Sequence, residues 1–283
     1  MNWGVRSVTV RFGKRIALSD VTFQALAGQV SGIVGGDGAG KSTLLRALVG
    51  AIRPDEGEVL RPGARQIGYM PSTSGVYPDL SVDENIAFAA AAYNVSRMDL
   101  QERAHALLSR TGLADVHDRL GGQLSGGMRQ KLGVLLAMIH RPSLLVLDEP
   151  TTGVDPVSRA GLWWLIARAA AEGAAVVLST SYVDEAERAA HLLVLDAGHH
   201  LASGTPDDII AAMPGTISRA ATRPQGDMAP LSWRRGAYWR VWSPPGVASA
   251  DRAQVIRPDL QDAVMVASLA LERKEATQGG AVR

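Results

Sequence analysis

A short apolar run that leads into a glycine-rich loop constrains this chain more than any other feature. Residues 30 to 34 read VSGIV, a pattern typical of a buried strand, and the loop GGDGAGKS follows at residues 35 to 42. The next segment, STLLRALVG, has apolar residues at helical spacing and stops at Gly50. A strand, a glycine loop and a helix in this order direct backbone N–H groups and the positive end of the helix at one point. The sequence therefore predicts an anion site between this strand and this helix.

The loop fits the pattern G-x-x-x-x-G-K-[ST], whose glycines let the backbone wrap closely round phosphate oxygens. In such a loop the lysine reaches the β- and γ-phosphates, and the hydroxyl that follows it binds Mg²⁺. Here these residues are Lys41 and Ser42. The residues that we expect to bind a nucleotide in this loop are Gly35, Gly36, Asp37, Gly38, Ala39, Gly40, Lys41, Ser42 and Thr43.

Strand and helix patterns alternate through the second half of the chain. Apolar runs at 144–147, 174–178 and 192–195 read as buried strands. The helical patterns that alternate with these strands lie near residues 156–171, 183–190 and 206–212. Such alternation implies a parallel sheet covered by helices, which is an α/β fold.

Other segments add to this core. Residues 5–10 and 21–25 read as short strands with a turn between them, which indicates a small β edge near the N-terminus. Residues 81–139 are mostly helical in pattern, beginning at a capping box formed by Ser81 and Glu84. Beyond Met213 the periodicity weakens. The remaining tail contains the aromatic and arginine-rich segment 233–242, read as an amphipathic strand, and a last helical stretch at 259–274.

Two acidic residues end one of the buried strands. The segment LLVLDEP places Asp148 and Glu149 after an apolar run, at the sheet edge where parallel strands present their ligand sites. We expect Asp148 to hold Mg²⁺ through water. We expect Glu149 to polarise the water that attacks the γ-phosphate, because a general base must lie within one hydrogen bond of that water.

A second glycine turn makes the pattern specific. The segment LSGGMRQ, at residues 124 to 130, opens a helix, and TTGVDP follows the acidic strand. In order and in sequence, these motifs resemble those of ATP-binding-cassette (ABC) ATPases. The resemblance implies a P-loop NTPase fold of the ABC type, with an N-terminal antiparallel β subdomain and a helical insert, that binds ATP and Mg²⁺. In that family two ATPase halves stack head to tail, and the signature turn of one half closes on the ATP of the other.

The resemblance also implies roles for individual residues. Phe12 occupies the position of the aromatic side chain that stacks on adenine, and Asp155 lies at the interface between the two halves. The signature residues that would act on the partner's ATP are Leu124, Ser125, Gly126, Gly127 and Gln130.

Several shorter segments look like those of exporter ATPases, especially the first half of tandem subunits that serve multidrug exporters. Among them are GYMP, VYPDLSVDENI and STSYVDEAER. This resemblance implies an ATPase domain at 1–212, a permease-contacting helical insert at about 72–130, and an accessory segment at 213–283. The partners it implies are a separate membrane permease and a second ATPase half, identical or different.

The sequence departs from the family at two positions. Ser72 stands where the family usually has the Q-loop glutamine, and Ser181 stands where it usually has the switch histidine. Serine is too short to replace the reach of glutamine and cannot carry the charge of an imidazolium. Losing one preorganised donor at such a site can slow a reaction roughly 10²- to 10³-fold. We therefore expect Glu149, Ser181 and Ser72 to form a catalytic site that hydrolyses ATP slowly.

Composition excludes several other classes of protein. The chain has no cysteine, which removes disulfides, thiolate nucleophiles and cysteine-ligated zinc. No stretch approaches the roughly 18 to 20 apolar residues of a membrane-spanning helix, so we expect a cytoplasmic protein held at the inner face of the membrane through its permease. The formal net charge is only +1, and we expect no nucleic-acid partner.

Two alternatives to an exporter subunit remain open. One is a non-transport ABC protein, such as a translation or repair factor. The other is a regulatory module whose switch is ATP binding alone. Measured turnover and association with a membrane permease distinguish these alternatives from the exporter subunit.

Overall fold

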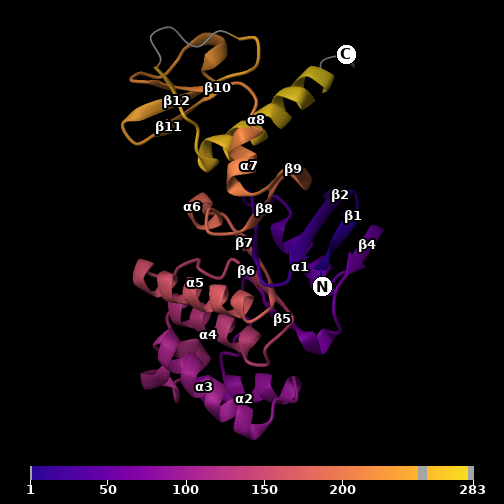
Figure 1. Cartoon of the computed structure of the whole chain (residues 1–283), viewed down its shortest axis with the longest axis vertical. Coiled ribbons are helices and arrows are strands. Elements are labelled where there is room, and N and C mark those ends of the chain that lie inside the picture. The colour runs from indigo at the N-terminus through magenta and orange to yellow at the C-terminus, as the bar shows by residue number, and fades with distance from the viewer. Residues whose placement is uncertain (1, 248–253, 280–283) are drawn as a thin grey trace. The chain divides into compact units, whose positions relative to one another are not determined.

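The computed structural model describes residues 2–247 and 254–279, and the chain divides into two compact units, Met1–His200 and Leu201–Arg283 (Figure 1). Each unit has its own hydrophobic core. The predicted ATPase domain at 1–212 and accessory segment at 213–283 remain expectations about how the chain is organised.

A nine-stranded sheet forms the frame of the first unit, in the order β4-β1-β2-β9-β8-β3-β7-β6-β5. Its strands are β1 (Asn2–Phe12), β2 (Arg15–Leu26), β3 (Val30–Val34), β4 (Glu56–Leu60), β5 (Ile67–Met70), β6 (Leu144–Asp148), β7 (Ala175–Thr180), β8 (His191–Asp196) and β9 (His199–Gly204). The five strands from β8 to β5 are parallel, whereas β1 pairs antiparallel with β2 and β4. The α/β class and the antiparallel N-terminal edge are therefore confirmed. β4 and β5 lie outside the predicted strands, because one is largely exposed and the other has only four residues.

The centre of the sheet positions the site. Every residue of β3, β6 and β7 is buried, which explains their continuous apolar runs. In the register of these strands Val34 lies opposite Thr180, and Asp148 lies opposite Ser179. The loops that leave β3, β6 and β7 therefore start side by side. Helix α1 (Lys41–Val49) begins at the end of the glycine loop and stops at Gly50, as predicted.

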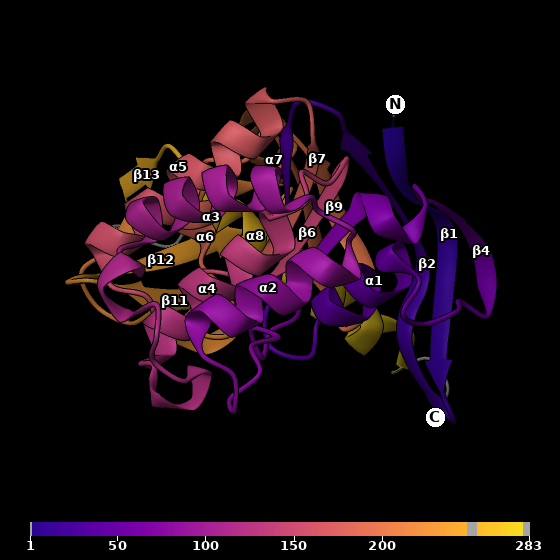
Figure 2. The same ribbon diagram turned by 90° about the horizontal axis from the view of Figure 1, so that it is seen from below.

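Three helices make up the predicted insert: α2 (Val82–Ala92), α3 (Arg97–Thr111) and α4 (Gly126–Met138). They group together in both views of the molecule (Figures 1 and 2). The predicted capping box is present, since Ser81 Oγ accepts from Glu84 N and a Glu84 carboxylate oxygen accepts from Ser81 N. Buried side chains of the insert form a core of their own, made of Val82, Ile86, Leu113, Leu124, Leu132, Leu135 and Ile139.

One helix prediction is wrong. The helix expected at 183–190 is the single turn α6 (Val183–Ala186), whose N-cap residue, Tyr182, makes no side-chain capping bond. Further along the chain, His199 and His200 are the first two residues of β9, and a turn precedes them. The turn itself consists of Ala197 and Gly198, both with positive φ, which is the backbone form that a two-residue hairpin requires.

Helix α5 (Pro156–Ala171) follows β6 as predicted, and Asp155 caps it by accepting hydrogen bonds from Val157 N and Ser158 N. Proline at its first position is preorganised for a helix.

The second unit contains a four-stranded antiparallel sheet in the order β11-β12-β10-β13. Its elements are α7 (Pro206–Ala211), β10 (Thr216–Ala220), β11 (Ser232–Arg235), β12 (Tyr238–Ser243), β13 (Gln254–Ile256) and α8 (Leu260–Gly279). The segment predicted as one strand at 233–242 is a hairpin, turning at Gly236 with φ 60°. Among the described helices, including the 20-residue α8, none is long and apolar enough to cross a membrane.

Gly68 of β5 generates a prediction about stability. A methyl group at this position would lie 2.0 Å from the Ala137 carbonyl oxygen of α4, so glycine is what allows the helix to lie against the strand. We expect Gly68→Ala to lower the free energy of unfolding by about 1 to 3 kcal/mol, because the clash is with backbone. Urea denaturation measures the loss. Gly63→Ala, whose added methyl group meets no atom within 4 Å, serves as the control. Equal midpoints for the two variants would contradict the prediction.

Candidate functional site

A pocket of about 370 Å³ lies over the glycine loop. Its lining residues are Phe12, Arg15, Ala17, Gly36, Asp37, Gly38, Ala39, Gly40, Lys41, Ser42, Thr43, Ser72 and Glu149. The structure thus brings together the predicted loop, the predicted aromatic residue and two of the three predicted catalytic residues. Phe12 is 54% exposed, so its ring is available to a ligand.

Glycine is required at two positions of the loop. A methyl group on Gly35 would lie 2.3 Å from the Leu195 carbonyl oxygen. Gly40 has φ 102°, and a methyl group there would lie 2.8 Å from the Ala17 carbonyl oxygen. The loop therefore rests directly on the backbone of two neighbouring strands, which a side chain at either position would prevent.

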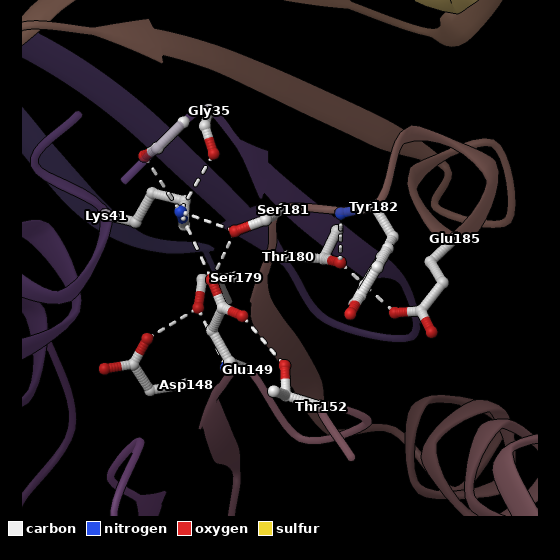
Figure 3. A network of polar contacts seen from close by, with 11 residues as sticks. Gly35, Lys41, Asp148, Glu149, Thr152, Ser179, Thr180, Ser181, Tyr182 and Glu185 are labelled. Carbon is white, nitrogen blue, oxygen red and sulfur yellow. Dashed lines mark hydrogen bonds and ion pairs between the residues drawn. The ribbon is translucent and has the colours of Figure 1, made fainter. Parts of the chain in front are cut away.

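Lys41 is the centre of the polar network (Figure 3). Its side chain is 7% exposed, and Nζ donates to the carbonyl oxygens of Gly35 at 2.8 Å and Gly36 at 3.1 Å. Nζ also donates to Ser181 Oγ at 3.0 Å and lies 3.2 Å from Glu149 Oε1. A buried ammonium needs such partners, and here they include two of the three predicted catalytic residues, Glu149 and Ser181, on neighbouring loops.

Glu149 is held at both carboxylate oxygens. Ser181 Oγ donates to Oε1 at 2.7 Å, and Thr152 Oγ1 donates to Oε2 at 2.9 Å. Burial acts to raise the pKa of Glu149, but the hydrogen bonds from Ser181 and Thr152 and the charge of Lys41 outweigh it, so the pKa lies below its ordinary value. Glu149 is therefore ionised at neutral pH.

The backbone of Glu149 is also fixed. Its φ is 53°, in the left-handed region that costs a residue with a side chain about 1 to 2 kcal/mol. Ser179 Oγ accepts a hydrogen bond from Glu149 N at 3.0 Å and so stabilises this conformation. The strained backbone directs the carboxylate toward Lys41, as Figure 3 shows.

Asp148 fits the predicted contact with Mg²⁺. The residue is fully buried, and its Oδ1 accepts from Ser179 Oγ at 2.6 Å. Its Oδ2 is buried and has no hydrogen-bond partner among the described residues. A buried carboxylate oxygen without a protein donor suits a hydrated cation, since carboxylate and water are the ligands that Mg²⁺ prefers. Ser42 lines the pocket and offers a hydroxyl oxygen, so the chemistry of both residues fits the ion.

The signature residues lie elsewhere in the same unit. In the described parts of the chain, none of Leu124, Ser125, Gly126, Gly127 and Gln130 lines the pocket. Ser125 caps α4, its Oγ accepting from Met128 N at 3.3 Å. A methyl group on Gly127 would lie 3.1 Å from the Gly153 carbonyl oxygen, so the signature turn adjoins the loop that precedes α5. This separation from the pocket is what action on a partner's ATP would require.

Asp155 lies on that same loop. It is exposed, and its pKa is lowered by hydrogen bonds from the side chain and backbone of Ser158, with a further contribution from the charge of Lys131. Its role in an interface between two halves remains a prediction.

Sequence reasoning missed several residues of the site. Arg15 lines the pocket, and Thr152 and Ser179 position Glu149. Hydroxyl residues that follow or end a strand are common in any sequence, so no local signal distinguishes them. Arg15 could have been predicted from its place in the sequence, because it follows closely after Phe12, the predicted adenine contact, at the start of β2.

Comparison with known proteins points to one family. The sequence model of the ABC transporter family matches residues 18–152. Over 199 residues the chain is 41% identical to the "Probable multidrug ABC transporter ATP-binding protein YbhF" of Escherichia coli (strain K12), and the match covers 67% of this chain and 34% of YbhF. The chain therefore spans about a third of the length of that relative.

Another relative is matched over most of its length. Over 217 residues the chain is 35% identical to the Nod factor export ATP-binding protein I of Cupriavidus metallidurans, covering 73% of this chain and 72% of the relative. Among solved structures, an ATP-binding subunit of an ABC transporter is similar with a TM-score of 0.71 and 30% identity, over 75% of this chain and 92% of that one.

The contacts of Ser181 generate a prediction about the pKa of Glu149. We expect Ser181→Ala to raise this pKa toward the ordinary glutamate value, because the substitution removes a hydrogen bond that favours the ionised form. Carbon NMR of labelled glutamate carboxyls measures the titration, and loss of the signal in Glu149→Gln assigns it. Ser109→Ala, an exposed position on α3, is the control. An unchanged titration in Ser181→Ala would contradict the prediction.

Proposed function

This chain belongs to the ABC transporter ATP-binding proteins, and we propose that it binds ATP and hydrolyses it to power a membrane exporter. One observation carries the proposal: the lysine of the phosphate loop, the strand-end glutamate and Ser181 form one polar network, and the lysine and glutamate line the pocket. Lys41 Nζ lies within 3.2 Å of both Glu149 Oε1 and Ser181 Oγ. The family membership supports an ATPase, and the names of relatives support export.

The chain's residues have distinct roles in this proposal. The backbone of the glycine loop binds the phosphates, Lys41 moves its donors from Glu149 and the loop carbonyls to the β- and γ-phosphates, and Phe12 stacks on adenine. Ser42 and Asp148 would hold Mg²⁺, which when bound neutralises phosphate charge. Glu149 orients and polarises the attacking water.

Hydrolysis is proposed to be slow for two reasons. Ser72 lines the pocket but is too short to span it as a glutamine does, and Ser181 offers one hydroxyl in place of an imidazolium. Each change removes stabilisation of the charge that develops in the transition state.

We also propose the partners. A second ATPase half, identical or different, would place its signature turn on this chain's ATP, and a membrane permease would contact the helical insert. Helices α2, α3 and the first residues of α4 lie within the predicted insert at about 72–130. Attachment to a permease would hold the chain at the cytoplasmic face of the membrane.

For the transported compound we propose a drug or small hydrophobic molecule. The support is the name of YbhF, "Probable multidrug ABC transporter ATP-binding protein". The relatives named for Nod factor export are similar over a larger share of their own length. Both names are of ATP-binding proteins, export is named only for the Nod factor relatives, and the compound is the most specific part of the proposal.

Lys41 provides a direct test of nucleotide binding. We expect Lys41→Ala to weaken ATP binding at least about 10-fold, because its ammonium supplies the positive charge for the terminal phosphates. Isothermal titration with ATP and Mg²⁺ measures the affinity. Lys131→Ala, which removes a lysine outside the pocket, is the matched control. If Lys41→Ala binds ATP as tightly as the control does, the role given to this lysine is wrong.

Steady-state turnover tests the slow site. We expect the chain alone to hydrolyse ATP slowly, and Ser181→His to raise kcat by roughly 10-fold or more by restoring a charged donor. Glu149→Gln should abolish the residual rate. Ser109→His, on the exposed side of α3, is the control for a histidine as such.

Two other outcomes would contradict the proposal of a slow hydrolytic site. Brisk turnover of the chain without a partner, lost in Glu149→Gln, would exclude a weakened site. ATP binding without any turnover, alone or with a partner half, would instead favour a regulatory ATP-binding module.

A further inference from the structure

A buried carboxylate outside the phosphate pocket joins the two loops that carry Glu149 and Ser181. Glu185 of α6 is 2% exposed and is not among the residues that line the pocket. Its Oε2 accepts hydrogen bonds from Thr151 Oγ1 at 2.6 Å and from Thr180 Oγ1 at 3.2 Å. Its Oε1 lies 3.2 Å from Nε of Arg159. Three elements therefore converge on one side chain.

The two threonines are close to the site in the chain. Thr180 immediately precedes Ser181, and its Oγ1 also accepts from Tyr182 N at 3.0 Å, so the backbone on both sides of Ser181 is fixed. Thr151 is two residues beyond Glu149. Figure 3 shows Glu185 approaching the loop of Ser181 from the side away from Lys41.

The third contact reaches the helix that follows the acidic strand. Arg159 lies in the first turns of α5, four residues after its cap, Asp155. Its guanidinium also lies over the Tyr182 ring, 5.2 Å from the centroid. One ion pair therefore connects the loop of Ser181 to the segment where an interface with a second ATPase half is proposed.

Such an arrangement is rigid for an energetic reason. A buried carboxylate is costly unless it is paired and hydrogen-bonded, and removing one partner leaves the others poorly satisfied. Glu185 has two hydroxyl donors and one cation, which come from three different segments. Moving any one segment breaks a contact that water cannot readily replace at a fully buried position.

We infer that Glu185 is a positioning residue for ATP hydrolysis, which fixes Ser181 against Glu149. The inference rests on the proposed function. Serine is short, so Ser181 Oγ meets Glu149 Oε1 at 2.7 Å and Lys41 Nζ at 3.0 Å only while its backbone stays in place. A displacement of about 1 Å breaks both hydrogen bonds, and misplacement on that scale can slow a reaction about 10²-fold. This chain lacks the switch histidine. The short side chain of Ser181 therefore depends on Glu185 for its position more than a longer side chain would.

Glu185→Gln is the primary test. Glutamine keeps the shape of the side chain, but it has no charge to pair with Arg159, and its amide places N–H donors beside the hydroxyls of Thr151 and Thr180, which already donate. We expect kcat to fall roughly 10- to 100-fold, with KM for ATP changed less than about twofold, because Glu185 does not line the pocket. Glu187→Gln is the matched control, since Glu187 is exposed and lies two residues further along the chain. Equal kcat in wild type and Glu185→Gln would overturn the inference.

A double-mutant cycle separates positioning from a general effect on stability. In a Ser181→Ala background the hydroxyl that Glu185 positions is absent, so we expect Glu185→Gln to lower kcat less than about twofold further. A merely structural role would give the same factor in both backgrounds. Additive effects would therefore overturn the inference. If Glu185→Gln fails to fold, Thr180→Val replaces it in the cycle, with a smaller loss of kcat expected.

Hydrogen exchange provides a readout that needs no nucleotide. We expect Glu185→Gln to speed amide exchange in peptides covering residues 150–155 and 179–187, while Glu187→Gln leaves both unchanged. Unchanged exchange in Glu185→Gln would contradict the inference that Glu185 fixes these two loops. Absence of turnover in the wild-type chain, with altered exchange in Glu185→Gln, would instead reject the proposed function, while the role of Glu185 in fixing the loops would stand.

Discussion

The register of three adjacent buried strands is the constraint on which the site depends. β3, β7 and β6 run parallel at the centre of the sheet, with Val34 opposite Thr180 and Asp148 opposite Ser179. The next residue of each strand is therefore Gly35, Ser181 or Glu149, and these three residues start neighbouring loops. A slip of one residue in either pairing would turn a catalytic side chain to the other face of the sheet.

The contacts of the loops then refine what the register begins. The glycine loop lies against the backbone of Leu195 and Ala17. In this position the side chain of Lys41 reaches back to a carbonyl group of the loop, that of Gly35. Ser179 fixes Glu149 in a left-handed conformation, and Glu185 braces the loop of Ser181. The accurate placement of the pocket residues thus depends on side chains outside the pocket. Functional side chains are commonly held in this way, by hydrogen bonds from the residues behind them.

The tertiary contacts change the meaning of the two departures from the family. In isolation, serine at position 181 is only a loss of charge and reach. In the structure its hydroxyl bridges the lysine and the glutamate, accepting from Nζ and donating to Oε1. Ser72 differs, because it lines the pocket and, among the residues that the structure describes, no hydrogen bond connects it to this network. The two substitutions are therefore not equivalent, although sequence treats them alike.

The sequence alone determined the α/β class, the phosphate loop, the acidic strand end and most helix boundaries, because these follow from local periodicity and from glycine, capping and charge patterns a few residues long. Prediction from the sequence failed for elements that local patterns do not specify. The sequences of β4 and β5 have no clear hydrophobic periodicity, and α6 ends after one turn. Only the tertiary structure decided which side chains meet. Glu185 lies 34 residues from Thr151 in the chain, yet the two share a hydrogen bond of 2.6 Å. Contacts of that kind arise from sheet register and packing, to which no single stretch of sequence is a guide.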